Sequence, residues 1–327
     1  MSELEFRKAI RDALDEEIER DPAVVFFGED VAAAGGVFMT TPDLQEKHGP
    51  DRVFDTPISE LAMAGAAFGA AVTGLRPVIE IMFGDFMGLA MDSLVNQSAK
   101  FWYVSNEQSS VPLVVRSAVG AGGRFGAMHS QIHGTWFQGI PGLKVVGPSN
   151  PADAKGLLKS AIRDDNPVIF LEHKRLYSMK GPPPSQETVP LGEAAVVRAG
   201  ADITLVAALR GVRDALEAAD ELAADGIDAE VVDIRSLRPL DHETVLESVA
   251  RTNRVLVVEE GPRVGGWAGN LLGVITAEGL HDLDDAWIVA TDDAPAPYSP
   301  TLEDAWLPGG AEIAAAVRGR LGVAAPS

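Results

Sequence analysis

The chain has 327 residues, 46% of them hydrophobic, and a formal net charge of −21. This length and apolar content predict a substantial core divided between two domains, and the acidity disfavours nucleic acid and anionic membranes as partners. Because the sequence has no cysteine, disulfides, thiolate nucleophiles, iron–sulfur clusters and cysteine-ligated zinc are excluded. No stretch approaches the roughly 20 uninterrupted apolar residues that a membrane-spanning helix needs.

The amino-terminal residues 1–21 have the pattern of a charged amphipathic helix. This stretch lacks the apolar centre of a signal peptide and is too acidic for a mitochondrial transit peptide. We therefore expect a cytoplasmic protein, in an organism that makes the chain without a leader.

The first 180 residues alternate short apolar runs with longer helix-period segments. Such runs, rich in β-branched residues and separated by helices, predict a parallel sheet that is covered on both faces. We expect strands at 24–28, 76–81, 111–116, 143–148 and 167–172, and helices at 60–74, 86–103 and 151–165.

Residues 181–192 interrupt this alternation with three consecutive prolines, which cannot continue a helix or a central strand. We predict a first domain of residues 1–180, a linker at 181–192, and a smaller second domain of residues 193–327. The expected fold class is α/β, with two doubly wound domains. In the second domain we expect strands at 203–208, 227–234, 254–261 and 286–291, and helices at 213–226, 241–251, 267–279 and 311–321.

The first motif that points to chemistry is DTPISELAMAGAAFGAAVTG. Ser59 is in position to cap a helix and Glu60 falls in its first turn, where an acid simply complements the helix dipole. The rest of the helix is almost without bulk, and each glycine costs about 1 kcal/mol against alanine. Such a helix is expected where another backbone comes very close, as in a tight subunit interface.

Two further motifs follow. Phe86 lies just after an expected strand, where open α/β sheets bind ligands, so its ring could stack on a flat heterocycle or be an ordinary core aromatic. His129 follows a glycine-rich loop and could act as an acid–base catalyst at neutral pH or be a hydrogen-bonded loop histidine. The loop is a poor match to a dinucleotide fingerprint. His129 and His133 have a spacing that suits zinc, but no third ligand is apparent.

Together these motifs resemble the β subunits of the decarboxylating component of 2-oxo acid dehydrogenase complexes, a thiamine-diphosphate-dependent, transketolase-like family. Its members include pyruvate, branched-chain 2-oxo acid and acetoin dehydrogenases. The likeness covers essentially the whole chain and is carried by GEDV, DTPISE, FGDF, MHSQ, PGLKVVGPSNPADAKGLLKSAIRDDNPVIFLE, VEEG and APYSPTLEDAWLP. It implies a pyrimidine-binding first domain and a second domain like that of transketolase at its carboxyl end.

The resemblance also implies roles for three residues. Glu60 would hydrogen-bond a pyrimidine ring nitrogen of thiamine diphosphate and so favour the imino tautomer that forms the reactive ylid. That role needs a largely dry site in which the carboxyl pKa can rise, against the helix dipole. Phe86 would pack on the pyrimidine ring. His129 would act around the substrate and in acyl transfer to a lipoyl group.

In this family a structural potassium ion is held mainly by backbone carbonyls, and oxygen ligands suit such a hard cation. The matching positions are Leu113, Ala161, Ile162, Asp164 and Asn166. Turn chemistry before Pro167 explains Asp164 and Asn166 equally well.

The chain lacks the GDG motif with which thiamine-diphosphate enzymes of this kind hold magnesium and the diphosphate. The resemblance therefore implies that magnesium is held by an α subunit, in a heterotetramer of two α and two β chains. It also implies a lipoyl acyltransferase core as a partner. Glu259, Glu260 and the acidic second domain could meet a basic module of that core, although solvated surface charge explains most such residues.

The expected function is oxidative decarboxylation of a 2-oxo acid, pyruvate before the others, with acyl transfer to the acyltransferase. MHSQ in place of the YHSQ associated with branched-chain enzymes favours pyruvate or acetoin. A self-sufficient transketolase-like enzyme is disfavoured by the chain length and the missing GDG motif. A non-catalytic scaffold is disfavoured because Glu60, Phe86 and His129 occur together.

Overall fold

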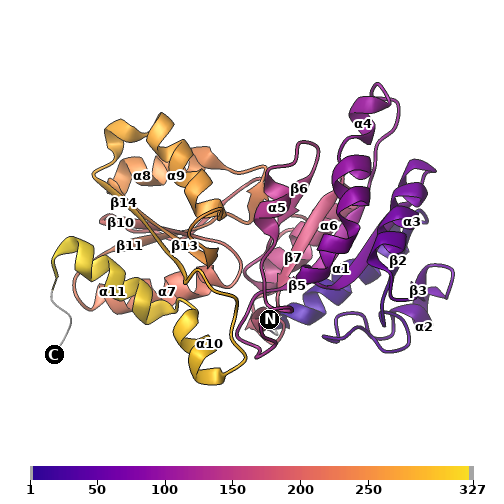
Figure 1. Cartoon of the computed structure of the whole chain (residues 1–327), viewed down its shortest axis with the longest axis horizontal. Coiled ribbons are helices and arrows are strands. Elements are labelled where there is room, and N and C mark those ends of the chain that lie inside the picture. Colours follow the sequence, from indigo (N-terminus) through magenta and orange to yellow (C-terminus); the bar gives the residue numbers. More distant parts are fainter. Residues whose placement is uncertain (1–2, 324–327) are drawn as a thin grey trace. The chain divides into compact units, whose positions relative to one another are not determined.

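The computed structural model describes residues 3–323, which form two compact units (Figure 1). The first unit comprises the residues up to Gly120 together with Met128–Leu191, and the second comprises Ala121–Ala127 and the residues from Gly192 onward. Both units have a mostly parallel sheet flanked by helices, so the expected α/β class is confirmed. The domain limits at 180 and 193 stay a prediction.

The sheet of the first unit contains neighbouring strands in the order β6-β7-β5-β4-β2-β3. Every neighbouring pair in this series is parallel. The strands are β2 (Val24–Gly28), β3 (Val53–Asp55), β4 (Arg76–Phe83), β5 (Val114–Val119), β6 (Lys144–Val146) and β7 (Val168–His173). A separate short antiparallel pair joins β1 (Leu4–Glu5) to β8 (Lys180–Gly181). Because all the strands of the series run the same way, their carboxyl ends meet at one edge of the sheet.

Helices cover both faces of this sheet. Helices α1 (Phe6–Arg20) and α6 (Pro151–Arg163) pack together over one face, and their apolar residues share a fully buried cluster with Phe26, Val78 and Phe170. On the other side, α3 (Glu60–Val72) packs against β4, and α5 (Gly134–Gln138) against β6 and β7. Helix α2 (Leu44–His48) contacts α1 and β3.

The segment expected as one helix at 86–103 is instead divided into three pieces, so that expectation was wrong. They are η1 (Gly84–Ala90), a 3₁₀ helix; η2 (Asp92–Ser98), a π-helix; and α4 (Phe101–Val104). In the π-helix, the Ser98 hydroxyl donates to the Ser93 carbonyl at 2.8 Å, five residues back. The Asp92 carboxylate also accepts from the side chain of Gln97, five residues ahead, at 2.9 Å. These five-residue bonds favour the wider turn of a π-helix.

The segment predicted as a linker is partly held against α6. The Ser160 hydroxyl donates to the Val189 carbonyl at 2.5 Å, and the Val189 amide donates to the Gly156 carbonyl at 3.2 Å. A Cβ atom at Gly156 would lie 2.6 Å from the Val189 side chain, so only glycine allows this approach. Residues near the end of the linker are therefore ordered by the first unit.

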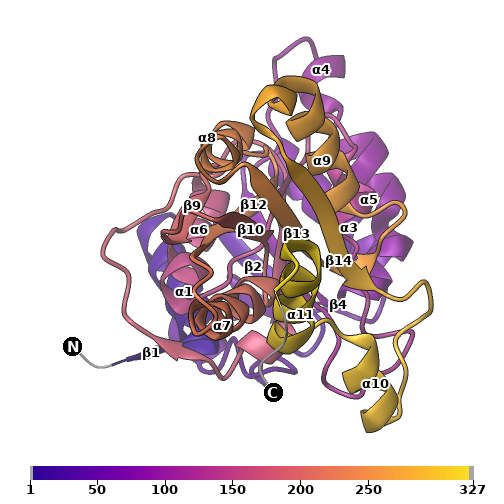
Figure 2. The same cartoon turned by 90° about the vertical axis from the view of Figure 1, so that its left-hand side faces the viewer.

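The second unit has a sheet in the order β14-β13-β10-β11-β9. Its strands are β9 (Ala195–Arg198), β10 (Ile203–Ala207), β11 (Ala229–Asp233), β13 (Arg254–Pro262) and β14 (Asp285–Thr291), of which only β9 is antiparallel to its neighbour. Helices α8 (His242–Thr252) and α9 (Trp267–Glu278) cover one face, and α7 (Gly211–Ala223) and α11 (Gly310–Leu321) the other (Figures 1 and 2). The unit also contains the short strand β12 (Ser236–Arg238), the 3₁₀ helix η4 (Leu280–Asp282) and helix α10 (Pro300–Trp306).

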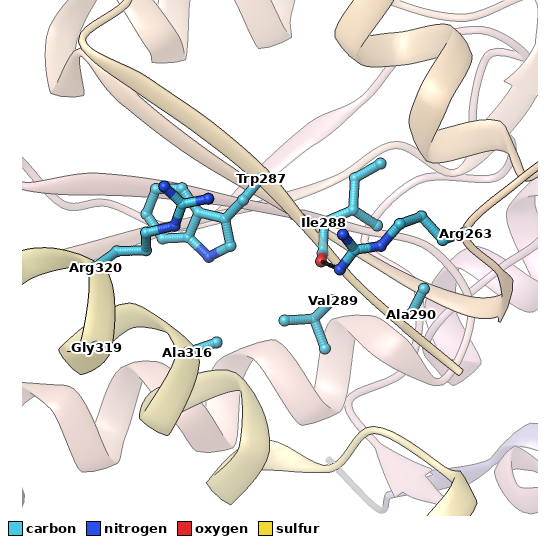
Figure 3. A pocket seen from close by; sticks show the side chains of 8 residues that line it. All are labelled: Arg263, Trp287, Ile288, Val289, Ala290, Ala316, Gly319 and Arg320. Carbon is cyan, nitrogen blue, oxygen red and sulfur yellow. Dashed lines mark hydrogen bonds between the residues drawn. The ribbon is translucent and has the colours of Figure 1, made fainter. Parts of the chain in front are cut away.

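An open hollow of about 530 Å³ lies beside the edge strand β14 in this unit (Figure 3). Arg320 stacks over the Trp287 ring at 5.5 Å, and the Arg263 guanidinium donates to the Ile288 carbonyl at 2.9 Å. At the start of the strand, the Asp285 carboxylate accepts the Ala286 amide at 2.8 Å. Arg263 and Asp285 thus bond backbone groups of the edge strand, which makes them less available for pairing with another chain.

Candidate active site

The expected catalytic and cofactor-binding residues follow strands of the first unit at the carboxyl edge of its sheet. Glu60 comes after β3, Phe86 after β4 and His129 after β5. Two residues that sequence reasoning did not single out join them, because Glu29 directly follows β2 and Lys174 directly follows β7. Open α/β sheets bind their ligands at this edge, so the topology alone gathers these side chains in one region.

Phe86 and His129 are in contact. Their ring centroids are 5.3 Å apart with the rings nearly perpendicular, at 79°. Phe83, the last residue of β4, packs edge-to-face on both, at 5.9 Å from Phe86 and 4.8 Å from His129. Phe86 and His129 are half-buried, so each keeps one side for a ligand while Phe83 supports the other.

Lys174 holds the backbone of the loop that carries His129. Its ammonium group donates to the His129 carbonyl and lies 5.4 Å from the centre of the Phe83 ring. The lysine is buried, so a charged donor in a dry setting fixes this carbonyl firmly. No motif marked Lys174 in advance, but its place directly after a central strand was a usable signal.

Glu60 occupies the first turn of α3 and is 6% exposed. Ser59 takes the capping position as expected, although its side chain forms no capping hydrogen bond. Helix α3 packs against η1, the segment that contains Phe86. The structure therefore brings Phe86 and His129 into direct contact and places Glu60 on the neighbouring helix.

Glu29 lies beside Glu60. Burial is the main cause that raises the pKa of Glu29, and the negative charges of Glu60 and Asp30 raise it further. Its Oε1 atom is buried and accepts no hydrogen bond from the described residues. The GEDV string includes Glu29, but only the structure shows that this residue lies near Glu60. Two buried carboxyl groups together form a place where a proton can be held.

The loop after His129 is tied to the turn that holds Phe86. The Gln131 side-chain amide donates to the Asp85 carboxylate at 2.8 Å. His133 is 2% exposed and packs edge-to-face on Trp136, with ring centroids 4.1 Å apart. Among the described residues no group of three or more metal-ligating side chains is found, so the His129–His133 spacing gains no third zinc ligand.

The glycine-rich loop is closely approached by other groups. A Cβ atom at Gly120, whose φ is +88°, would lie 2.1 Å from the His173 ring. At Gly126, with φ +70°, it would lie 2.2 Å from the Tyr298 ring. Both positions therefore require glycine for two reasons, the left-handed backbone and the lack of space.

The five positions expected to hold potassium lie before β5 and around the end of α6. Three of their carbonyl groups already accept hydrogen bonds: Arg76 donates to Ile162 at 3.0 Å and to Asp164 at 2.8 Å, and Val168 donates to Leu113 at 2.8 Å. Each carbonyl oxygen keeps a second lone pair, so the oxygen set still fits a cation. The Asp164 carboxylate also pairs with Lys144.

Two acidic residues of the second unit are not solvated surface charges. Glu259 is 3% exposed and accepts the backbone amides of Trp267 and Ala268 at 2.8 and 3.0 Å, which caps helix α9. Burial raises the pKa of Glu259, while these two bonds lower it. Glu260 accepts the Ala121 amide at 2.5 Å. Neither carboxylate fits the expected role of a freely exposed docking charge, and Glu259 is excluded from it by burial.

Within residues 3–323, none of the helices combines the length and apolar character required to cross a membrane.

Comparison with known proteins defines the class. Residues 2–180 match the family model "Transketolase, pyrimidine binding domain", and residues 192–313 match "Transketolase, C-terminal domain". A solved split gene transketolase, described as an inactive beta4 tetramer, superposes with a TM-score of 0.81 at 25% identity and covers 98% of this chain and 99% of its own. The chain is a transketolase-like protein with a pyrimidine-binding domain.

Within that class the relatives are β subunits. The chain is 47% identical to an acetoin:2,6-dichlorophenolindophenol oxidoreductase subunit beta of Cupriavidus necator, covering 96% of each protein. It is 44% identical to a 2-oxoisovalerate dehydrogenase subunit beta of Bacillus subtilis, covering 97% of this chain and 98% of the relative. A pyruvate dehydrogenase E1 component subunit beta of Rickettsia felis is 43% identical, covering 95% of this chain and 96% of the relative. The chain belongs to this family of thiamine-diphosphate-dependent dehydrogenase β subunits.

Proposed function

We propose that this chain is the β subunit of a 2-oxo acid dehydrogenase that decarboxylates pyruvate and passes the acyl group to a lipoyl acyltransferase. The observation that carries this proposal is the gathering of Glu60, Phe86 and His129 at the carboxyl edge of the first domain. A buried carboxyl group, a half-exposed aromatic ring and a half-buried imidazole suit the pyrimidine end of the cofactor and the substrate next to it.

Thiamine diphosphate, when bound, supplies the nucleophilic carbon that attacks the substrate carbonyl. In our proposal Glu60, which is 6% exposed, hydrogen-bonds a nitrogen of the pyrimidine ring and holds a proton there, with the buried Glu29 beside it. Phe86 orients the pyrimidine by stacking. His129, with its backbone held by Lys174, exchanges a proton with the substrate and the acyl acceptor.

The site needs a second chain. The sequence has no GDG motif, so we propose that an α subunit holds magnesium and the diphosphate, in an assembly of two α and two β chains. The inactive beta4 tetramer of the split gene transketolase supports this reading, since that assembly lacks activity. We further propose a structural potassium ion at Leu113, Ala161, Ile162, Asp164 and Asn166, and a cytoplasmic location.

Reconstitution tests the proposal. The chain should show no turnover alone with magnesium and thiamine diphosphate, and should turn over pyruvate once the matching α chain is added. Rates with pyruvate, branched-chain 2-oxo acids and acetoin, each at saturating concentration, identify the substrate. Activity of the isolated chain, or no activity of the complex with any of these substrates, would contradict the proposal.

Acetoin is the second candidate. The 47% identity to an acetoin:2,6-dichlorophenolindophenol oxidoreductase subunit beta favours it, and the MHSQ string is compatible with either acetoin or pyruvate. A kcat/KM for acetoin more than tenfold above that for pyruvate would replace the first candidate with the second.

A further inference from the structure

His133 is a buried titratable group of the first unit that the proposed chemistry does not use. It is 2% exposed, and neither ring nitrogen has a hydrogen-bond partner among the described residues. Burying an imidazole whose nitrogens have no partner destabilises the folded chain, because the ring gives up its hydrogen bonds to water. A purely apolar ring of the same size would fill the same space against Trp136 without that cost. Packing alone therefore does not explain why this position has a histidine.

Asp85 is a neighbouring group that also has a buried polar atom without a partner. One of its carboxylate oxygens, Oδ1, accepts the Gln131 amide at 2.8 Å, whereas Oδ2 is buried and has no partner among residues 3–323. The Asp85 charge lies close enough to raise the pKa of His133, while burial, the larger cause, lowers it. A ring kept neutral in this way has one N–H to donate, and Asp85 Oδ2 is an acceptor without a donor.

The backbone between these residues is pressed against the ring. A Cβ atom at Gly84 would lie 3.6 Å from His133 Nδ1 and 2.6 Å from the Val119 side chain. Gly84 and Asp85 begin the η1 segment that contains Phe86, and His133 ends the loop that begins at His129. Asp85 and His133 thus lie on the two segments that contain Phe86 and His129, the aromatic ring and the imidazole of the candidate site.

We propose that His133 is a positioning residue that pairs with Asp85 Oδ2 and thereby fixes the Phe86 turn against the His129 loop. Because neither His133 nitrogen bonds Asp85 directly, the pairing runs through one bound water and adds a second connection to the Gln131–Asp85 bond. His133 itself does not touch the reacting atoms. The inference rests on the proposed function only for its effect on catalysis, since the pairing is a property of the chain alone.

Two substitutions separate pairing from packing. His133→Phe keeps the size and removes both nitrogens, whereas His133→Asn keeps a donor near Nδ1 and shortens the side chain. In the complex with the α chain we expect His133→Phe to lower kcat about 10- to 100-fold with little change in KM, because small misplacements of reacting groups have effects of this size. His133→Asn should keep kcat within about threefold. His281→Asn, at a 78% exposed histidine of the second unit that lies 3.1 Å from Asp282, is the control for a histidine change at the surface and outside the first unit.

The opposite order would overturn the proposal, since a residue that only packs tolerates Phe better than Asn. The pH profile of kcat/KM provides a further check. If His133 only positions other groups, the apparent pKa values of this profile should be the same in His133→Asn as in the wild type. If one limb of the profile disappears in His133→Asn, the residue transfers protons itself and the proposal is wrong.

A double-substitution cycle in the isolated chain tests the pairing without activity. Unfolding is followed in urea for the wild type, His133→Phe, Asp85→Asn and the double variant. We expect the combined effect on the unfolding equilibrium constant to differ from the product of the single effects by about three- to tenfold. Strict multiplication would refute the pairing. A wild-type complex without turnover would refute the proposed function and leave this measurement valid.

Discussion

Glu29 of the first domain differs from two buried carboxylates of the second, Glu259 and Glu303, in whether its oxygens have partners. In the second domain, Glu259 accepts two backbone amides of α9, and Glu303 accepts the Gly122 and Arg124 amides and the Arg124 guanidinium. In the first domain, Glu29 keeps a buried oxygen without a described donor beside a second acid, Glu60. Satisfied carboxylates hold structure together, whereas unsatisfied ones are retained where a ligand or partner completes them.

Other buried polar atoms follow the same division. Asp85 Oδ2, the Ser130 hydroxyl and both nitrogens of His133, all near the candidate site, have no partner within the described part of the chain. In the second domain the comparable atoms are Trp287 Nε1 and Thr291 Oγ1, and both lie on the edge strand β14. These unsatisfied atoms of the first domain thus surround the candidate site, whereas those of the second lie on its edge strand.

Among the substitutions that test this comparison, Glu60→Gln should have the largest effect on activity. In the reconstituted complex kcat should fall at least about 100-fold, because the proton held at the pyrimidine is lost, while urea unfolding of the chain stays close to wild type. Steady-state rates and denaturation curves measure the two quantities. Unchanged turnover would instead support a scaffold that has kept the fold.

Glu259→Ala should have the opposite effect, lowering the stability of the chain and leaving its activity unchanged. Two amides of α9 lose their acceptor, so the free energy of unfolding should fall by about 1–2 kcal/mol. The kcat of the folded complex should remain close to wild type. Glu193→Ala, at an exposed glutamate of the same domain, is the control and should change neither quantity. A large loss of kcat without a loss of stability would show that the second domain contributes to the chemistry.

Glu29→Gln should stabilise the isolated chain at neutral pH. The folded-state pKa of Glu29 is raised above its ordinary 4.5, so as pH rises above that value the unfolded state loses its proton first and folding becomes less favourable. Gln removes this cost, and the gain should be absent at pH 4 and on the order of 1 kcal/mol or less at pH 7. Urea unfolding at the two pH values measures it. An equal gain at both would show that charge is not the cause.

Potassium should have the smallest effect. A cation bound to the carbonyls around Asp164 stabilises the folded chain by about 0.4 kcal/mol when its concentration equals the dissociation constant. Thermal unfolding in potassium chloride and in tetramethylammonium chloride at matched ionic strength measures this contribution. Equal midpoints at all concentrations would remove the ion from the proposal.

Much of the fold could be predicted from local patterns, and the exceptions have physical causes. The strand at 24–28 and the helix that starts at Glu60 were predicted with nearly their observed limits, because apolar runs and helix periodicity are local signals. The single helix expected at 86–103 was wrong, since side-chain bonds at five-residue spacing changed its turn. The short strand β9 was missed because two exposed valines gave no clear alternation.

The sequence by itself determined the two α/β domains, the family and the residues Glu60, Phe86 and His129, because ordered motifs and periodicity need no knowledge of distant contacts. Tertiary structure alone decided which of these residues meet. It placed Phe86 on His129, Glu29 beside Glu60, and His133 near Asp85. It also showed that Glu259 is a buried helix cap, whereas the sequence alone suggested a solvated surface charge. Burial and hydrogen bonding depend on the register of strands far apart in the chain, and no local pattern records that register.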